Sequence, residues 1–187
     1  MKSLAKLSRK PIVKVAPKRL EGFIVDVGAG GEGVIAKTYG RNTVGVDINR
    51  REIIEAKSRG SNAQWVLGDA CSMPFRDDSF DLATFFFSLM YIKTPERKKA
   101  VFVEAKRVLK SDGQLCLWDA IIHEKPDLYV VFVEISLPDG EEIFTGYGVR
   151  GEEKEQHLEL INKLALEAGF KVSRAESHKD LVEACYH

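Results

Sequence analysis

The sequence predicts an α/β protein built around a doubly wound, mostly parallel β-sheet, and three observations lead to this class. Strand-like and helix-like segments alternate along the chain. Several strand-like runs are apolar at every position, as expected for parallel strands that are covered on both faces. The first run ends in a glycine-rich loop, residues 28–33, which opens a helix. With 187 residues, 44% of them hydrophobic, the chain can bury the core of one domain.

Five strands and four helices make up this alternation. The strands are predicted at residues 24–27, 43–46, 63–67, 82–87 and 114–119. The helices are predicted at residues 33–39, 50–59, 95–108 and 153–168. Thr94 provides an N-cap for the third helix, Pro95 is its first residue, and Gly169 stands where the fourth helix must stop.

A β-hairpin is predicted after the fifth strand. Residues 128–136 and 141–149 are β-rich, and the turn residues Leu137-Pro138-Asp139-Gly140 join them. The hairpin leaves the sheet at the carboxyl edge, where open α/β sheets bind ligands. It is therefore expected to be a lid over a substrate, with a structural ribbon or a dimer contact as the alternatives.

Charge is balanced overall but uneven along the chain. The charges of the 28 basic and 28 acidic residues cancel, so the net charge of the whole chain provides no long-range attraction to nucleic acid or to a membrane. Seven of the basic residues and no acid fall in residues 1–20. We expect residues 1–21 to be a solvated basic arm, which RNA or another anionic surface could contact, and residues 22–187 to be the domain.

The cysteines and the hydropathy pattern indicate in which cellular compartment the protein is expected. Cys71, Cys116 and Cys185 are too few and too scattered for a disulfide framework or a metal site, and Cys116 is expected to be a small core residue. The chain has neither an 18-residue apolar run nor a signal peptide. A cytoplasmic protein without membrane contact is expected.

A nucleoside site is predicted from the first two strands. The glycines at positions 28, 30 and 33 follow the first strand, and Asp47 closes the second, where a carboxylate can accept hydrogen bonds from both ribose hydroxyls. Two further acids, Asp26 and Asp69, also follow or end strand-like runs. Asp26 would repel a pyrophosphate but attract a cationic ligand, which disfavours a nicotinamide dinucleotide.

Five motifs in chain order resemble those of class I S-adenosylmethionine (SAM)-dependent methyltransferases. They are residues 25–30 (VDVGAG), 46–48 (VDI), 68–70 (GDA) with 73–75 (MPF), 78–82 (DSFDL) and 107–115 (RVLKSDGQL). The resemblance runs from about Gly22 to the C-terminus. Within the family, the chain is similar to small single-domain archaeal members with unassigned substrates. It implies a Rossmann-like, seven-stranded sheet closed by residues 170–174 and an antiparallel last strand, residues 181–186. One departure is Glu32, which replaces the usual third loop glycine.

The resemblance also implies a role for each cofactor-binding residue. Asp26 would serve the methionyl ammonium of SAM, and Asp47 the ribose. The other residues implied to contact SAM, or its product S-adenosylhomocysteine, are Gly28, Ala29 and Gly30 at the methionine and ribose, Ile48, Asp69 and Ala70 at the adenine, and Phe85 and Phe86 as a floor. No metal is expected.

Methyl transfer requires a base only when the acceptor carries a proton, because most of the rate can come from positioning and water exclusion. Tyr91, after the fourth strand, and Asp119 or His123, near the end of the fifth, are the candidates at the expected mouth of the site. His123 is the natural base near neutral pH, and Tyr91 is expected to contact the acceptor.

The expected function is methylation of a small-molecule O, N or C nucleophile by in-line displacement. One alternative is an RNA or protein methyltransferase that uses the basic arm, although nucleic acid is not favoured. Another is a non-catalytic partner subunit of the same fold, and a homodimer is also compatible with the sequence.

Overall fold

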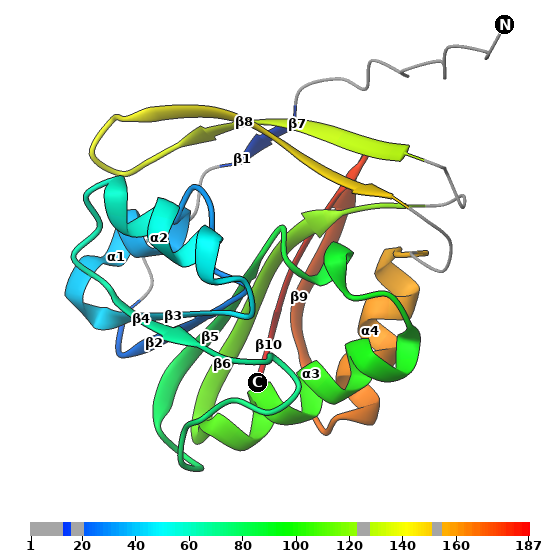
Figure 1. Ribbon diagram of the computed structural model, residues 1–187. Coiled ribbons are helices and arrows are strands. Elements are labelled where there is room, and N and C mark those ends of the chain that lie inside the picture. The colour runs from blue at the N-terminus through cyan, green and yellow to red at the C-terminus, as the bar shows by residue number, and fades with distance from the viewer. Residues whose placement is uncertain (1–12, 16–20, 123–127, 151–154) are drawn as a thin grey trace, which may run out of the picture.

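The computed structural model describes residues 13–15, 21–122, 128–150 and 155–187. Its larger sheet has seven strands in the order β4-β3-β2-β5-β6-β10-β9 (Figure 1). They span Gln64–Leu67 (β4), Thr43–Asp47 (β3), Ile24–Val27 (β2), Phe80–Phe86 (β5), Leu109–Ala120 (β6), Leu181–Tyr186 (β10) and Val172–His178 (β9). The first five strands in this order, β4, β3, β2, β5 and β6, pair in parallel. Strand β10 runs antiparallel to both of its neighbours, β6 and β9. The predicted α/β class is therefore confirmed.

In the described residues, four α-helices and two 3₁₀ turns accompany these strands. They are α1 (Val34–Tyr39), η1 (Gly40–Asn42), α2 (Arg50–Ser58), η2 (Leu89–Tyr91), α3 (Pro95–Val108) and α4 (Leu158–Glu167). Thr94 caps α3 as predicted, because its hydroxyl accepts a hydrogen bond from the Arg97 amide at 3.3 Å. Among these described helices, none is both long enough and apolar enough to cross a bilayer.

The predicted start of the last helix, residue 153, is wrong. Helix α4 begins at Leu158, and the His157 side chain caps it by accepting the Leu160 amide at 3.3 Å. Gln156 cannot be helical because its backbone forms a bridge with Ile122 through two hydrogen bonds of 2.6 and 2.9 Å. This long-range bridge outweighs the local helix preference of the preceding residues.

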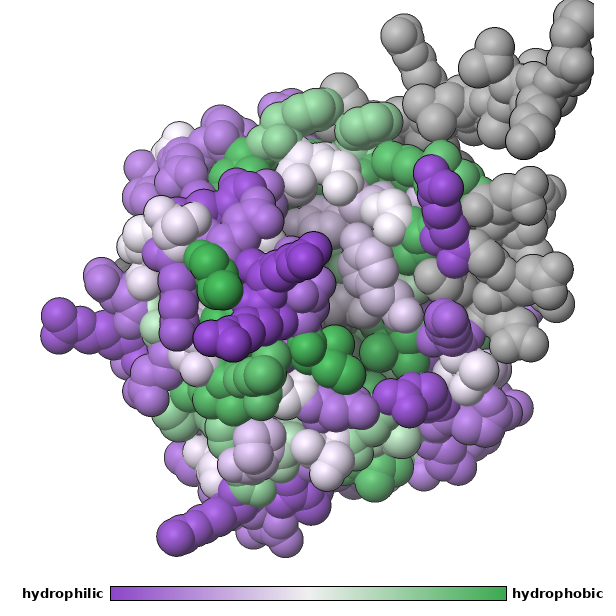
Figure 2. All heavy atoms as spheres, in the orientation of Figure 1, coloured by the Kyte–Doolittle hydropathy of each residue, from purple (hydrophilic) through white to green (hydrophobic). Residues whose placement is uncertain are grey.

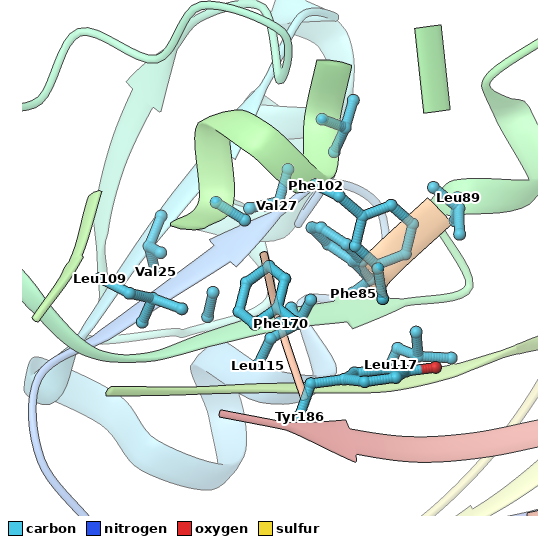
Figure 3. Packing of buried hydrophobic residues seen from close by; sticks show 14 of the residues in the cluster. Val25, Val27, Phe85, Leu89, Phe102, Leu109, Leu115, Leu117, Phe170 and Tyr186 are labelled. Atoms are coloured by element: carbon cyan, nitrogen blue, oxygen red, sulfur yellow. The ribbon is translucent and has the colours of Figure 1, made fainter. Parts of the chain in front are cut away.

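Each face of the larger sheet has its own apolar core. Figure 3 shows one of them, where Phe102 of α3 and Phe170 pack against Phe85 and Tyr186 of the sheet. Phe85 and Phe102 meet edge to face, with ring centroids 5.5 Å apart. The next residue, Phe86, belongs to the core on the opposite face, because successive side chains of a strand alternate between faces.

A second sheet covers that opposite face (Figure 1). It has the order β1-β7-β8, and its strands are Val13–Val15 (β1), Leu128–Ser136 (β7) and Glu142–Arg150 (β8). We call it the cover sheet. The β7–β8 hairpin turns through Gly140, which has a φ of 88° and donates its N–H to the Leu137 carbonyl at 3.0 Å.

Part of the expected basic arm belongs to the cover sheet. Residues 13–15 pair in parallel with residues 133–135 of β7, and Val15 is only 4% exposed. The prediction of a solvated arm over residues 1–21 is therefore wrong for β1. The alternating apolar residues of Val13–Val15 explain why this segment pairs with a strand.

One disulfide joins β6 to β10. Cys116 and Cys185 lie opposite each other in the antiparallel pair, with their Cα atoms 4.2 Å apart. Cys116 is buried, as expected. Three scattered cysteines are too few to predict a disulfide framework, and this single bridge was not predicted. The sequence separation of 69 hides the pairing in the sequence, and only the closing strand brings the two together.

Candidate active site

A glycine-rich loop follows β2 and is fixed against β3. The amides of Gly28 and Ala29 both donate to the Val46 carbonyl, at 2.7 and 3.1 Å. Gly28 has a φ of 73°, and a Cβ there would lie 2.5 Å from the Ser88 Cβ. A Cβ on Gly30 would collide with Glu52 and lie 2.8 Å from the Asp47 carboxylate. The loop therefore needs glycine at both positions.

Asp47 lies at the carboxyl end of β3 and is held by the backbone. Its Oδ2 accepts the Gly30 amide at 3.1 Å, and its Oδ1 accepts the Asn49 amide at 2.7 Å. Carboxylate oxygens have about four lone-pair sites, so each oxygen keeps capacity for another donor. The backbone thus holds the Asp47 carboxylate in place, and its remaining lone pairs can accept hydrogen bonds from two neighbouring hydroxyl groups.

Asp26 is buried beside the same loop. It is 2% exposed, and its Oδ1 accepts a hydrogen bond from the Thr84 hydroxyl at 2.7 Å. Burial raises the pKa of Asp26 to about 7; the Thr84 hydrogen bond opposes this rise, and the nearby Asp47 charge adds to it. A cation bound in front of Asp26 would stabilise the charged carboxylate.

Asp69 follows β4 at the next strand end. Its Oδ1 accepts the Cys71 amide at 2.9 Å, and its Oδ2 accepts from Arg97 Nη2 at 3.2 Å. The Cys71 hydrogen bond is the main reason why the pKa of Asp69 lies below its usual value. Asp69 is therefore an ionised acceptor with a fixed orientation.

Aromatic side chains form another wall of the site. Tyr147 of β8 stacks on Phe87, with ring centroids 4.5 Å apart and planes 5° apart. Phe87 has a φ of 49°, a strained conformation for a bulky residue that turns the chain from β5 into η2. Burial raises the pKa of Tyr91, and the Gly148 backbone of β8 opposes this rise. The Tyr147–Phe87 stack thus attaches the cover sheet to the segment after β5.

These groups surround one cavity of about 710 Å³ at the carboxyl ends of β2 to β5. In Figure 2 this face is hollowed below the cover sheet, with hydrophilic residues along one side of the hollow. The volume lies in the range of small-molecule and cofactor sites. Within the described ranges, no three His, Cys, Asp or Glu side chains are arranged to hold a metal ion.

The structure brings nine of the ten predicted cofactor residues to this cavity, together with Tyr91. The nine are Asp26, Gly28, Ala29, Gly30, Asp47, Ile48, Asp69, Ala70 and Phe86. Phe85 is placed differently: it is 1% exposed in the core against α3 and does not line the cavity. His123 lies outside the described residues.

The chemistry of these residues fits SAM. Acids outnumber bases along the cavity, which suits a sulfonium and an ammonium. Ile48 is 70% exposed beside Asp47 and offers an apolar surface to a flat base. The carboxylates at the carboxyl ends of β2, β3 and β4 can each accept from a different polar group of one nucleoside.

Three comparisons with known proteins agree with this site. Residues 25–117 match the family model described as "Methyltransferase domain". The chain is 36% identical over 125 residues to an uncharacterized methyltransferase, YcgJ, of Bacillus subtilis, covering 63% of this chain and 48% of that protein. It is 34% identical over 149 residues to the 2-methoxy-6-polyprenyl-1,4-benzoquinol methylase of rat mitochondria, covering 70% of this chain and 44% of the relative. The chain belongs to the class I SAM-dependent methyltransferases. SAM is accordingly its cofactor.

The solved structures support the fold of this methyltransferase. The PH0226 protein from Pyrococcus horikoshii matches with a TM-score of 0.66 and 24% identity, covering 90% of this chain and 82% of that one. The chain spans about half the length of the curated relatives that it matches.

Several residues at the methyltransferase site were not predicted from the sequence. Glu52, one turn into α2, lines the cavity, and its pKa is raised by burial and then by the Asp47 charge. Its position three residues after the cap Asn49 is a capping-box pattern that could have indicated it. Phe87 and Tyr147 had no comparable signal, because their contact depends on how the hairpin folds back.

Proposed function

We propose that this chain catalyses methyl transfer from SAM to a small-molecule acceptor by in-line displacement. The observation that carries the proposal is the convergence of Asp26, Asp47 and Asp69 on one cavity beside the glycine loop. When bound, SAM supplies a methyl group on a cationic leaving group. The chain's own part is to bind, orient and exclude water, which can supply most of the rate.

The roles of the cofactor residues follow from their positions. Asp26 pairs with the methionyl ammonium, Asp47 holds the ribose hydroxyls, and Asp69 accepts from the adenine amino group. The backbone of Gly28 to Gly30 lies against the methionine and the ribose. Ile48 and Ala70 enclose the adenine. Phe86 keeps the floor role that was expected of it, and Phe87 takes the place that was expected of Phe85.

The cover sheet acts as the lid in this proposal. Thr145, Gly146 and Tyr147 of β8 line the cavity together with the cofactor residues, and the Tyr147–Phe87 stack restricts access from that side. A lid that excludes water strengthens the electrostatic interactions inside the site. Tyr91 then contacts the acceptor, and His123 remains the predicted base.

A quinol-like ring is the candidate acceptor that one observation favours. Phe86, Phe87, Tyr91 and Tyr147 give the cavity an aromatic wall, and aromatic rings stack favourably on such surfaces. Several relatives are named as ubiquinone, menaquinone or benzoquinol methyltransferases. We propose that the acceptor is a flat, conjugated small molecule of this kind.

Residues 22–187, together with strand β1 (Val13–Val15) that pairs with β7, are proposed to act as one domain in the cytoplasm. A homodimer, an RNA or protein acceptor and a non-catalytic partner role keep the status of alternatives. Of the basic arm, the structure describes residues 13–15 and 21.

Calorimetry with S-adenosylhomocysteine tests the proposal. Asp47→Ala is expected to weaken binding by about 10- to 100-fold, because hydrogen bonds to a charged group are lost. Asp112→Ala is the matched control, since Asp112 is exposed on β6 and does not line the cavity. Equal affinities of the two variants, or no binding to the unmodified chain at millimolar ligand, would refute the proposal.

A further inference from the structure

A buried polar chain of three side chains lies beside the cavity. Lys98 of α3, Gln156 before α4 and Asp119 of β6 are each at most 1% exposed. Lys98 Nζ donates to Gln156 Oε1 at 2.6 Å, and Gln156 Nε2 donates to Asp119 Oδ1 at 2.8 Å. None of the three lines the cavity, and the proposed chemistry assigns no part to them. Buried groups of this kind are costly unless they are fully satisfied.

The hydrogen-bonded series of these three side chains ends at the backbone of η2. Asp119 Oδ2 accepts the amides of Leu89 and Met90, at 2.8 and 3.4 Å. These two amides are the first N–H groups of η2, and the first N–H groups of a helical turn have no acceptor within that turn. The side chain of Ser88, which precedes η2, does not accept from them either. Asp119 therefore caps η2 from a neighbouring strand, and its second oxygen also accepts the Ala120 amide at 2.8 Å.

The capped turn carries residues of the cavity wall. Ser88 precedes η2 and Tyr91 ends it, and both line the cavity. Phe87, just before Ser88, stacks on Tyr147 of β8 with ring centroids 4.5 Å apart. Hydrogen bonds thus run from α3 through Asp119 to η2, and the ring stack joins the segment around η2 to the cover sheet.

We propose that Asp119 is a positioning residue that fixes η2 and, through the neighbouring Phe87–Tyr147 stack, holds the cover sheet over the cavity. The bracing side chains Gln156 and Lys98 hold the carboxylate in the orientation that η2 requires. The part that concerns ligand affinity depends on the proposed function, whereas the part that concerns the cover sheet does not.

Asp119→Asn is the informative substitution. Asparagine has one acceptor oxygen where aspartate has two, so its NH₂ must face either the Leu89 amide or the NH₂ of Gln156. Both arrangements set a donor against a donor. Adding Gln156→Glu relieves part of the conflict, because the new carboxylate accepts from the introduced NH₂ and pairs with Lys98, which leaves the oxygen of the introduced amide for Leu89. The Ala120 amide and the Ala120 carbonyl, which are paired with Asp119 Oδ1 and Gln156 Nε2, lose their partners in this double variant, so the rescue is expected to be partial.

Hydrogen exchange measured by mass spectrometry is the primary readout. In D119N, exchange of residues 88–91 and of β8 is expected to rise about tenfold, while β9 exchanges as before, because only the local opening energy changes. The double variant D119N/Q156E should return both segments toward the original rates. Asp112→Asn, on the exposed part of the same strand, is the matched control and should change neither.

Two further measurements complete the test. Tyr147→Leu should raise exchange in β8 but leave residues 88–90 protected, because it removes only the ring stack on Phe87. If D119N does not fold, Gln156→Met retains the carboxylate and should give a smaller rise in the same two segments. Exchange that rises uniformly over the chain, or not at all in residues 88–91 and β8, would overturn the inference.

Affinity for S-adenosylhomocysteine separates this inference from the proposed function. We expect D119N to weaken binding about fivefold, since Ser88 and Tyr91 belong to the cavity wall. Failure of the unmodified chain to bind would refute the proposed function and leave the exchange result to decide the role of Asp119. Unchanged affinity in a D119N variant with a loosened η2 would remove only the link to the ligand.

Discussion

Tyr147 and Phe87 lie flat against each other, 60 residues apart in sequence, with their ring centroids 4.5 Å apart. One ring comes from the cover sheet and the other from the turn that follows β5. The pair therefore joins the two sheets at the cavity. Because it combines a strained backbone with a close ring contact, this junction is a sensitive place to perturb the lid.

Tyr147→Ala is expected to lower the free energy of unfolding by about 2–4 kcal/mol more than Tyr147→Phe. The alanine loses the ring pair, which contributes about 0.5–1.5 kcal/mol beyond its buried area, and also the burial of the ring itself, which contributes about 1.5–3 kcal/mol. Urea denaturation measures both variants. Tyr147→Phe is the control because it keeps the ring and removes only the hydroxyl. Equal stability of the two variants would show that the stack does not hold the cover sheet.

Asp26 predicts a pH dependence of cofactor binding. Its pKa is about 7 in the free protein because of burial, and a bound ammonium favours the carboxylate. Affinity for S-adenosylhomocysteine should therefore fall as pH drops below about 7, by up to about tenfold per pH unit. Calorimetry between pH 5.5 and 7.5 in two buffers should detect proton release on binding.

The same shift has the opposite effect on the stability of the free protein. The folded-state pKa of Asp26 lies above its ordinary value of 3.8, so the folded state binds the proton more tightly than the unfolded state. Its contribution to stability is present below about pH 4 and is lost as pH rises to about 7. In Asp26→Asn, both the binding profile and this contribution should become flat; a pH slope that persists would assign it to another group.

Gly30→Ala tests the close packing of the loop. The added Cβ would meet Glu52 and the Asp47 carboxylate, so ligand affinity should fall at least tenfold as Asp47 is displaced. Gly60→Ala is the comparison: Gly60 has a φ of 83° and nothing within 4 Å of the added Cβ. It should cost about 1–2 kcal/mol of stability through backbone strain and leave affinity unchanged. Loss of binding in both variants would indicate general destabilisation.

Cys185→Ser is expected to destabilise the chain under oxidising conditions. The Cys116–Cys185 bridge closes a span of 69 residues, for which loop-closure entropy gives about 4 kcal/mol. Thermal unfolding with and without a reducing agent measures the effect, and the variant should no longer respond to the reductant. Thiol titration of the denatured, unsubstituted chain should find one free cysteine, Cys71. Since disulfides are rare in the cytosol of most organisms, three free thiols in protein from cells would support the cytoplasmic prediction instead.

The cofactor half of the site could be predicted because it depends on local patterns. Asp26, Asp47 and Asp69 each come at or just after the end of a strand, and parallel strands end at the same edge. The register of β5 was harder to predict. Residues 85–87 are all apolar, so alternation cannot show which of them faces the cavity, and Phe85 proved to face the other core.

The part of the cavity proposed to hold the methyl acceptor, and the buried side chains that hold Asp119, could not be predicted. Both depend on contacts between segments that lie far apart in the sequence. Tyr147 reaches Phe87 only when the hairpin folds back, and Gln156 meets Asp119 only through its bridge to Ile122. Asp119 itself was considered as a base near the mouth. The structure instead places it in the interior, with backbone and side-chain donors on its oxygens.

The pairing of β1 with β7 has a practical consequence for experiments on shortened chains. Removing the residues before Gly22 would delete Val13–Val15, which pair with residues 133–135, and would leave those backbone groups without their neighbour. Exposed strand edges recruit strands from other molecules. A trimmed protein could therefore self-associate for reasons unrelated to its natural assembly, and affinity handles are better separated from this strand by a cleavable spacer.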